Sequence, residues 1–267
     1  MDLDTYRIAP DQPVHLADLD PDAPAGIDKD DALDQVADAT DQLSELQERL
    51  YAEGRHKVLV VLQAIDTGGK DGAIRKVFGP LNPQGVRIAS FKAPTGPELA
   101  HDYLWRIHRE TPGTGEIVVF NRSHYEDVLV VRVHGLVPEE RWRARYRHLV
   151  EFERMLAEEG TTIVKCFLHI SRDEQRERLQ ARVDDPTKRW KFNPGDLEER
   201  ARWDDYVAAF DEMLSRTSTA YAPWYVVPAN RKWFRDLVIS RLLVETLRNL
   251  DPRFPEADPS IVTTQIA

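Results

Sequence analysis

The sequence predicts an α/β fold in which helices cover both faces of one parallel sheet. Five short apolar runs alternate along the chain with segments of helical periodicity. The runs are continuously apolar, as expected for parallel strands that are buried on both faces. At 267 residues, the chain is also long enough for one large domain of this kind with a well-buried core.

Each apolar run is assigned to a strand and each periodic segment to a helix. The predicted strands cover residues 58–63, 86–91, 115–121, 161–170 and 224–229. The predicted helices cover residues 31–54, 70–78, 97–110, 138–160, 172–183, 195–218 and 230–250, with another starting at about Ser123. Asp30 or Asp31 is expected to cap the start of the first helix, and Gly54 to end it.

The segments outside the predicted domain have a different composition. Residues 1–30 are rich in Asp and Pro, which disfavours helix and strand and predicts an extended N-terminal arm. We expect this arm to lie on the surface of its own subunit or of a neighbour. Residues 31–250 then form the domain, and residues 251–267 a C-terminal tail.

Composition and charge exclude several classes of function. Hydrophobic residues make up 42% and charged residues 31%, an ordinary cytosolic balance. The formal net charge of −10 argues against binding to nucleic acid or to an acidic membrane, so a polyanionic ligand requires a local basic cluster. The single cysteine, Cys166, excludes an internal disulfide. Because no signal peptide or membrane span is recognisable, we expect a cytoplasmic protein.

Residues 57–78, KVLVVLQAIDTGGKDGAIRKVF, place a glycine-rich loop between a strand and a helix. We call residues 64–70 the phosphate loop, because they resemble the Walker A pattern G-x-x-x-x-G-K-[ST] in the strand–loop–helix context that this pattern requires. Ala64 replaces the first glycine of the pattern, and Asp71 replaces the metal-binding hydroxyl residue. A plain strand-to-helix turn with a surface lysine is the alternative.

Backbone and side chains of this segment suit a bound phosphate. Glycines let backbone N–H groups approach an anion, and the helix N-terminus adds a partial positive charge. The residues expected to contact phosphate are Thr67, Gly68, Gly69, Lys70, Arg75 and Lys76. Asp66 is expected to hold Mg²⁺ in place of the missing hydroxyl, since this ion prefers oxygen ligands. For Asp71, a carboxylate stabilised by the helix dipole is the favoured interpretation.

A second polar group follows the third strand, in GEIVVFNRSHYEDVLV. Asn121 and Arg122 stand where that strand ends, and ligands of parallel α/β folds bind beyond the carboxyl ends of the strands. Arg122 is expected to bind phosphate oxygens with its guanidinium group, and Asn121 to contact the substrate. Ser123 and Glu126 also fit a capping box, S-x-x-E, which is a purely structural alternative for Glu126.

A basic break interrupts two predicted helices at residues 181–197, ARVDDPTKRWKFNPGDL. Its cations, Lys188, Arg189 and Lys191, surround Trp190. We interpret about residues 182–200 as a mobile lid that brings these cations over bound phosphates. A solvated basic loop without a ligand is the alternative.

Together these segments resemble the polyphosphate kinase-2 family. The similarity is carried by QAIDTGGKDGAIRKVFGPLNPQGVRIASFKAPTGPELAHDYLWRIH, GEIVVFNRSHYEDVLVVRVHG, KRWKFNP and YVVPANRKWFRDLVISRLL, and runs from about residue 30 to residue 250. It implies a P-loop kinase fold similar to thymidylate kinase, with three α/β/α layers, a five-stranded parallel sheet and a helical lid. It also implies reversible phosphate transfer between inorganic polyphosphate and nucleotides with Mg²⁺, or Mn²⁺ as the alternative, in a homodimer or homotetramer.

The resemblance assigns roles to individual residues. Asp66 matches the family's loop aspartate, which binds Mg²⁺ and the acceptor phosphate, and Arg122 matches the arginine after the third strand. The basic residues that match the polyphosphate path and the lid cations are Lys70, Arg75, Arg189 and Lys191. Many members have Asp where Asn121 stands, so Glu126 becomes the candidate for the lost carboxylate. NRSHYED resembles the branch that phosphorylates both AMP and ADP.

The sequence therefore predicts a polyphosphate-dependent phosphotransferase that acts on AMP, ADP or both. The predicted catalytic residues are Asp66, Lys70, Arg122 and Glu126, of which Asp66 and Glu126 hold the metal. Adenine nucleotides are expected, with guanine nucleotides as an alternative, and neither nucleic acid nor membrane is expected as a partner. Two other functions stay open: an ATP-dependent nucleoside or nucleotide kinase on the same fold, and a nucleotide-binding switch without transfer chemistry.

Overall fold

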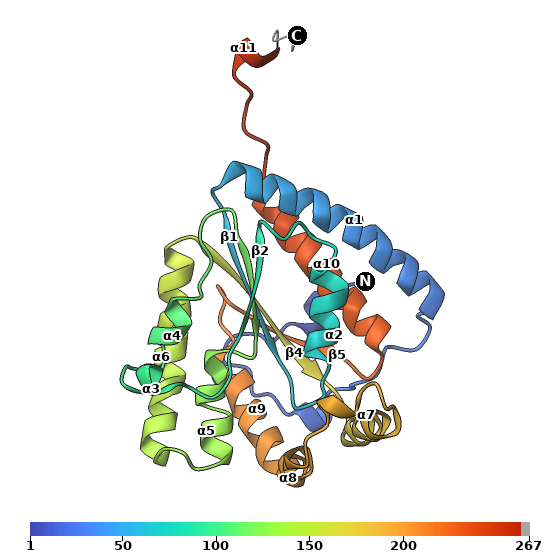
Figure 1. Cartoon of the computed structure of the whole chain (residues 1–267), viewed down its shortest axis with the longest axis vertical. Helices are drawn as coiled ribbons and strands as arrows, with labels where there is room; N and C mark the ends of the chain where they lie inside the picture. Colours follow the sequence, from blue (N-terminus) through green and yellow to red (C-terminus); the bar gives the residue numbers. More distant parts are fainter. Residues whose placement is uncertain (263–267) are drawn as a thin grey trace.

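One five-stranded parallel sheet lies between helices in the computed structural model, which describes residues 1–262 (Figure 1). The strand order is β2-β3-β1-β4-β5, and every neighbouring pair is parallel. The strands are β1 (Lys57–Gln63), β2 (Val86–Ser90), β3 (Ile117–Asn121), β4 (Thr161–His169) and β5 (Trp224–Pro228). The predicted α/β fold with five parallel strands is confirmed.

The central strand β1 shows how a continuously apolar run fits into this sheet. Val58 to Leu62 are fully buried because helices cover both faces of the sheet. In the register of the sheet, Leu62 of β1 lies opposite Asn121 of β3 and Cys166 of β4. The loop after β1 and the turn after β3 therefore leave the sheet side by side, at its carboxyl edge.

The α-helices lie outside the sheet, and most of them form two layers that cover its faces (Figure 1). They are α1 (Lys29–Glu53), α2 (Lys70–Ala73), α3 (Gly96–Leu99), α4 (Trp105–His108), α5 (Val130–Val133), α6 (Glu139–Glu158), α7 (Arg172–Asp184), α8 (Gly195–Ala201), α9 (Trp203–Thr217), α10 (Lys232–Leu250) and α11 (Pro259–Val262). A π-helical turn, η3 (Ile74–Phe78), continues α2. Helices α1 and α10 pack together on one face of the sheet, and α6 and α9 on the other (Figure 1). Within residues 1–262, every helix is too short or too polar to cross a membrane.

Helix boundaries differ from the prediction in several places. Asp28, rather than Asp30 or Asp31, caps α1, because its Oδ1 accepts from the N–H groups of those two residues at 2.8 and 3.1 Å. The predicted cap was therefore wrong by two or three positions. Gly54 ends α1 with a left-handed φ of 60°, as predicted.

Three predicted helices are shorter or broken in the structure. The segment 97–110 contains two separate short helices, α3 and α4, and the segment 195–218 is interrupted at Arg202 between α8 and α9. The helix expected from about Ser123 is instead a 3-10 turn, η4 (His124–Asp127), followed by α5. In η4, His124 and Tyr125 are buried and both hydrogen-bond to Glu153 of α6.

The N-terminal arm packs against its own chain. Leu3, Ile8, Val14 and Leu16 are buried in the core, although Asp and Pro dominate the segment around them. The backbone N–H groups of Val14 and Leu16 donate to side chains of α9, and the N–H of Ile8 donates to the edge strand β5. The arm therefore covers the outer edge of the sheet.

After α10, the chain leaves the domain and projects away from it towards α11 (Figure 1). The predicted C-terminal tail, 251–267, begins where α10 ends. Its last five residues, 263–267, lie outside the described residues.

Candidate active site

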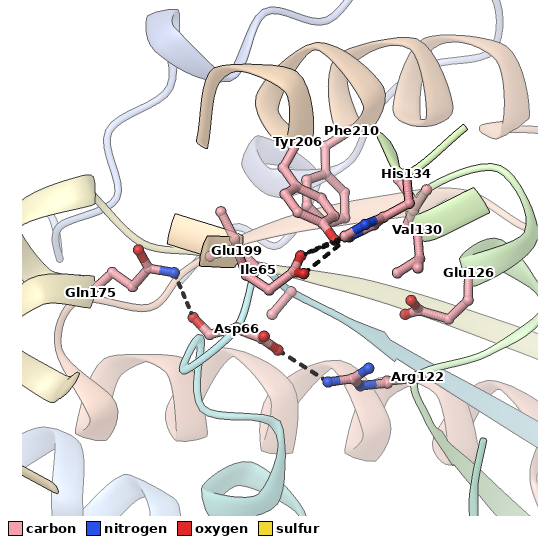
Figure 2. Close-up of a pocket in the computed structure, with 12 residues that line it drawn as sticks. Ile65, Asp66, Arg122, Glu126, Val130, His134, Gln175, Glu199, Tyr206 and Phe210 are labelled. Carbon is pink, nitrogen blue, oxygen red and sulfur yellow. Dashed lines mark hydrogen bonds and ion pairs between the residues drawn. The ribbon is translucent and has the colours of Figure 1, made fainter. Parts of the chain in front are cut away.

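A cavity of about 230 Å³ lies at the carboxyl edge of the sheet, where the phosphate loop meets the turn after β3 (Figure 2). Charged side chains from these two segments line one part of it, and side chains from α5, α7, α8 and α9 line the rest. The lining residues are Ala64, Ile65, Asp66, Arg122, Glu126, Leu129, Val130, His134, Gln175, Glu199, Tyr206 and Phe210.

The backbone of the phosphate loop is tightly folded. Thr67 and Gly69 have left-handed φ angles of 64° and 103°. A Cβ atom on Gly68 would lie 2.5 Å from the Cβ of Ala64, so only glycine fits there. The N–H of Gly68 donates to the carbonyl of Ile65 at 3.0 Å. In this arrangement the Gly68 N–H is bonded within the loop, and the absence of a side chain on Gly68 allows the loop to fold closely.

Two arginines support the loop from behind. Arg178 of α7 donates to the carbonyl of Thr67 at 3.0 Å, and Arg235 of α10 donates to the carbonyl of Gly69 at 3.1 Å. Arg235 is 2% exposed and is itself held by Asp236. Because a trans peptide points its N–H and C=O in opposite directions, fixing the Gly69 carbonyl turns the N–H of Lys70 away from Arg235.

Lys70 is buried and folds back over the loop. Its ammonium group donates to the carbonyl of Ala64 at 2.9 Å. Burial lowers the pKa of Lys70, and the negative charges of Asp66 and Glu126 partly oppose this effect. The ammonium group is thus held close to Asp66 and Glu126, whose carboxylates line the cavity.

The turn after β3 brings the predicted arginine to the same place. Arg122 has a left-handed φ of 63°, and its Nη2 donates to Asp66 Oδ1 at 3.0 Å (Figure 2). Asn121 at the end of β3 donates to Asp71 at 2.7 Å and does not line the cavity. The sequence motifs of two separate segments therefore meet through the pair Asp66 and Arg122.

Glu126 also reaches the cavity, and it does not close a capping box. With the Gln63 amide oriented so that both of its polar atoms find partners, its oxygen accepts from the N–H of Ser123 at 3.2 Å and its nitrogen donates to Glu126 at 3.1 Å. Ser123 still caps the turn by accepting from the N–H of Tyr125 at 3.2 Å. Burial raises the pKa of Glu126, although Arg122 and Lys70 pull it down.

The remaining predicted residues lie outside the cavity lining. Arg75 and Lys76 are exposed on η3. The lid cations are exposed as well: Lys188 pairs with Asp185 at 2.6 Å, and Arg189 donates to the carbonyl of Val183. Lys191 lies beside the ring of Trp190, which is 79% exposed. None of these three cations is among the residues that line the cavity, whereas Glu199, near the end of the predicted lid, is.

Sequence reasoning missed a cluster at the far side of the cavity. Glu199 of α8 accepts from the hydroxyl of Tyr206 at 2.6 Å and from His134 at 3.0 Å (Figure 2). These residues come from α8, α9 and the end of α5, and no local motif joins them. The apolar pattern of α9 predicts that Tyr206 is buried but does not show what it faces.

The carboxylates of the cavity fit a partly exposed divalent cation. In the described part of the chain, no three His, Cys, Asp or Glu side chains gather in a metal-binding group. Asp66 and Glu126, however, line the same cavity, and magnesium sites in phosphate-transferring enzymes use one or two carboxylates together with substrate phosphates and water. These two residues therefore fit such an ion.

Comparison with known proteins agrees with this geometry. The family model described as Polyphosphate kinase 2 (PPK2) matches residues 26–255. The chain belongs to the polyphosphate kinase 2 family. The predicted resemblance is thus confirmed, and membership in this phosphotransferase family indicates that a divalent metal takes part.

Related members of the polyphosphate kinase 2 family cover most of the chain. It is 58% identical over 255 residues to the AMP/ADP-polyphosphate phosphotransferase of Meiothermus ruber, covering 95% of this chain and 96% of that protein. It is 47% identical over 232 residues to the ADP-polyphosphate phosphotransferase of Rhodopseudomonas palustris, covering 82% and 80%. The crystal structure of Polyphosphate Kinase 2 from Arthrobacter aurescens TC1 superimposes with a TM-score of 0.91 at 46% identity, covering 95% of this chain and 91% of that chain. The P-loop kinase fold is therefore confirmed.

Proposed function

We propose that this enzyme transfers the terminal phosphoryl group of inorganic polyphosphate to AMP and to ADP. The observation that carries the proposal is the convergence of Asp66, Arg122 and Glu126 on one cavity beside the phosphate loop. The relatives support the choice of substrates. The Meiothermus ruber protein is named for both AMP and ADP, and the more distant Rhodopseudomonas palustris protein for ADP.

The residues of the cavity suit phosphoryl transfer by positioning and charge neutralisation. Lys70 and the start of α2 hold the phosphate that is transferred, and Arg122 stabilises the charge on its oxygens. The attacking oxygen of a nucleotide phosphate is already anionic, so the reaction requires no strong general base. The proposed reaction therefore does not require a catalytic histidine at the phosphate loop.

We propose Mg²⁺ as the divalent ion, with Mn²⁺ as the alternative, held by Asp66 and Glu126. When bound, the ion neutralises charge on the donor and acceptor phosphates. The Asp66 carboxylate is already fixed beside Arg122, so its orientation towards the cavity does not depend on the ion. Calorimetric titration with Mg²⁺ in the presence of ADP, compared between wild type and Asp66→Asn, tests this assignment.

The other residues that the sequence singled out remain candidates for substrate binding. These candidates are Thr67, Gly68, Gly69, Arg75, Lys76, Asn121, Lys188, Arg189 and Lys191. We propose that the lid closes over the polyphosphate chain and brings the last three of them, its cations, to the phosphates. The buried hydroxyl of Thr67 has no hydrogen-bond partner in the described residues, which is consistent with a ligand contact.

The decisive experiment uses polyphosphate as the sole phosphate donor. The purified protein with Mg²⁺ and polyphosphate should convert AMP to ADP and ADP to ATP. Turnover with ATP but none with polyphosphate would instead indicate an ATP-dependent nucleotide kinase. Nucleotide binding without turnover from either donor would indicate a switch. The Asp66→Asn variant serves as the negative control.

We also propose that the enzyme is a homodimer or homotetramer, as the family resemblance implies, and that it uses adenine nucleotides, with guanine nucleotides as the alternative. Light scattering after size exclusion measures the number of subunits, and parallel assays with GMP and GDP measure the base preference.

A further inference from the structure

The turn after β3 divides its side chains between the cavity and the interior. Arg122 and Glu126 line the cavity. Ser123, His124 and Tyr125, which lie between them in the sequence, are fully buried. Whatever holds the buried side chains therefore also sets the direction of the two cavity residues.

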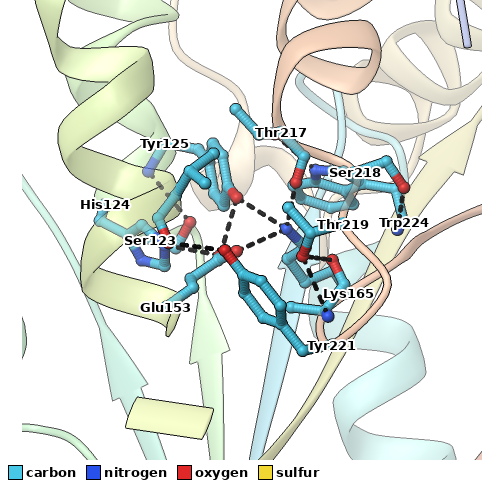
Figure 3. Close-up of polar contacts among 12 residues, drawn as sticks. Ser123, His124, Tyr125, Glu153, Lys165, Thr217, Ser218, Thr219, Tyr221 and Trp224 are labelled. Atoms are coloured by element: carbon cyan, nitrogen blue, oxygen red, sulfur yellow. Dashed lines mark hydrogen bonds and ion pairs between the residues drawn. The ribbon is translucent and has the colours of Figure 1, made fainter. Parts of the chain in front are cut away.

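One carboxylate holds two of these buried side chains (Figure 3). Glu153 of α6 accepts from the hydroxyl of Tyr125 at 2.7 Å and from Nε2 of His124 at 3.0 Å, both through Oε1. The other carboxylate oxygen accepts from the ammonium group of Lys165 at 2.6 Å. Glu153 and Lys165 both have fully buried side chains.

The ammonium group of Lys165 in β4 has a hydrogen-bond acceptor for each of its three N–H donors. Besides Glu153, it donates to the hydroxyl of Tyr125 at 2.9 Å and to the carbonyl of Thr217 at 2.7 Å. An ammonium group has three donors and no acceptor, so each donor has a partner. Burial opposes the charge of Glu153, but Lys165 and His124 outweigh it and hold its pKa below the usual value.

This buried ion pair calls for an explanation beyond stability. Removing two charges from water is costly, and well-packed apolar side chains would often stabilise a core as well. The turn that the pair anchors also contains a strained residue: Arg122 has a left-handed φ of 63°, which a non-glycine residue keeps only where its surroundings hold it. His124 and Tyr125, which Glu153 anchors, follow Arg122 directly.

We propose that Glu153, held by Lys165, is a positioning residue that fixes the turn carrying Arg122 and Glu126 into the cavity. It acts through Tyr125 and His124 and contacts no substrate. The proposal rests on the proposed phosphoryl transfer at this cavity.

The test uses Tyr125→Phe rather than a change of Glu153. The variant Glu153→Gln leaves the Lys165 charge buried without its counter-ion and is expected to fold poorly. Tyr125→Phe removes one hydroxyl and leaves the ion pair in place. We expect kcat to fall about tenfold or more, because a small misplacement of charge-stabilising groups is costly, with KM values for polyphosphate and ADP changed less than about threefold.

The matched control is Tyr221→Phe. This change also removes one phenolic hydroxyl, which donates to the carbonyl of Val150 in α6 at 3.0 Å. Tyr221 lies between α9 and β5 and is not among the residues that line the cavity. Both variants should lose thermal stability. Only Tyr125→Phe should lose kcat, and Tyr221→Phe should stay within about twofold of wild type.

A double-mutant cycle shows whether the effect passes through the turn. In an Arg122→Ala background, Tyr125→Phe should lower kcat by a smaller factor than it does in wild type, because one of the two cavity residues that the turn positions is gone. A fully active Tyr125→Phe enzyme, or an undiminished effect in the Arg122→Ala background, would overturn the positioning role while leaving the proposed function intact. A wild-type chain that transfers no phosphate from polyphosphate would overturn both proposals.

Discussion

Asp66 and Glu126 line one cavity, but their surroundings make them chemically different. Asp66 is paired with Arg122 at 3.0 Å and is partly exposed to solvent. Glu126 is buried, and burial raises its pKa. The two carboxylates are therefore expected to contribute differently to metal and substrate binding, which substitution of each one can resolve.

The change Asp66→Asn should nearly abolish phosphate transfer and leave the fold intact. It removes an anionic metal ligand at almost constant volume, and loss of one charge-stabilising group typically costs about 10²–10³ in kcat. Steady-state rates with polyphosphate and ADP, together with circular dichroism, measure both effects. Asp173→Asn, the same change on the exposed first turn of α7, is the control. Turnover like that of wild type in Asp66→Asn would exclude the metal role.

Removing the positive charge of Lys70 or of Arg122 should lower the rate of phosphate transfer as much as Asp66→Asn does. We expect Lys70→Ala and Arg122→Ala each to lose about 10²–10³ in kcat, because each removes a positive charge next to the transferred phosphate. Lys57→Ala is the control, since Lys57 contacts a backbone carbonyl at the opposite end of β1. Losses below about threefold in both variants would place the reaction elsewhere.

Glu126 should decide how well the shorter acceptor is used. A carboxylate at this position can hold the metal so that AMP and ADP both reach the donor, and AMP depends more on that bridge. We expect Glu126→Ala to lower the AMP rate more than the ADP rate. The rate ratio of the two acceptors in wild type and variant measures this. An unchanged ratio would indicate that Glu126 has only a structural role, and that role would not be a capping box.

The pH profile provides an internal control for Glu126. Its pKa is raised above 4.5, so the carboxylate gains its charge only as the pH rises through that higher value. The AMP rate of wild type should therefore increase with pH across this acidic window, and Glu126→Gln should lack that step.

At the scale of elements, the lid is the part whose position the proposed polyphosphate binding depends on most. Its 3-10 turn η5 (Arg189–Lys191) stands between α7 and α8 with its cations exposed. We expect Arg189→Ala and Lys191→Ala to raise KM for long polyphosphate about three- to tenfold, as for the loss of exposed ionic contacts, and to affect triphosphate and nucleotide less. Arg176→Ala on the exposed face of α7 is the control. Equal effects on chain and nucleotide affinity would contradict a lid that binds the chain.

At the scale of the whole molecule, the N-terminal arm joins the edge of the sheet to the helical layers. Leu16 is only 3% exposed, so Leu16→Ala should destabilise the protein by about 2–5 kcal/mol, as for other buried leucines. Leu33→Ala on α1, where the side chain is 39% exposed, should cost about 0.5 kcal/mol or less. Urea unfolding measures both. Equal small losses would mean that the arm does not contribute to the folded core.

The sequence by itself determined the sheet, the phosphate loop and the family. These depend on short stretches of the chain: continuous apolar runs give buried strands, GGK after a strand gives the loop, and Gly54 ends a helix. Asp66, Lys70, Arg122 and Glu126 could be selected as candidates because they follow strands whose carboxyl ends meet at one edge. Their catalytic roles remain predictions.

Only the tertiary structure decided which distant side chains support that site. Arg178 lies in RDEQRERLQARV, where nothing distinguishes it from its charged neighbours, yet it binds the carbonyl of Thr67. Arg235 behind Gly69, and Glu153 beneath the turn after β3, are equally hidden in helical sequences. A residue's partners across the sheet depend on the order of the strands and on how the helices pack, and the periodicity of a single segment shows only whether a side chain is buried, not what it meets there.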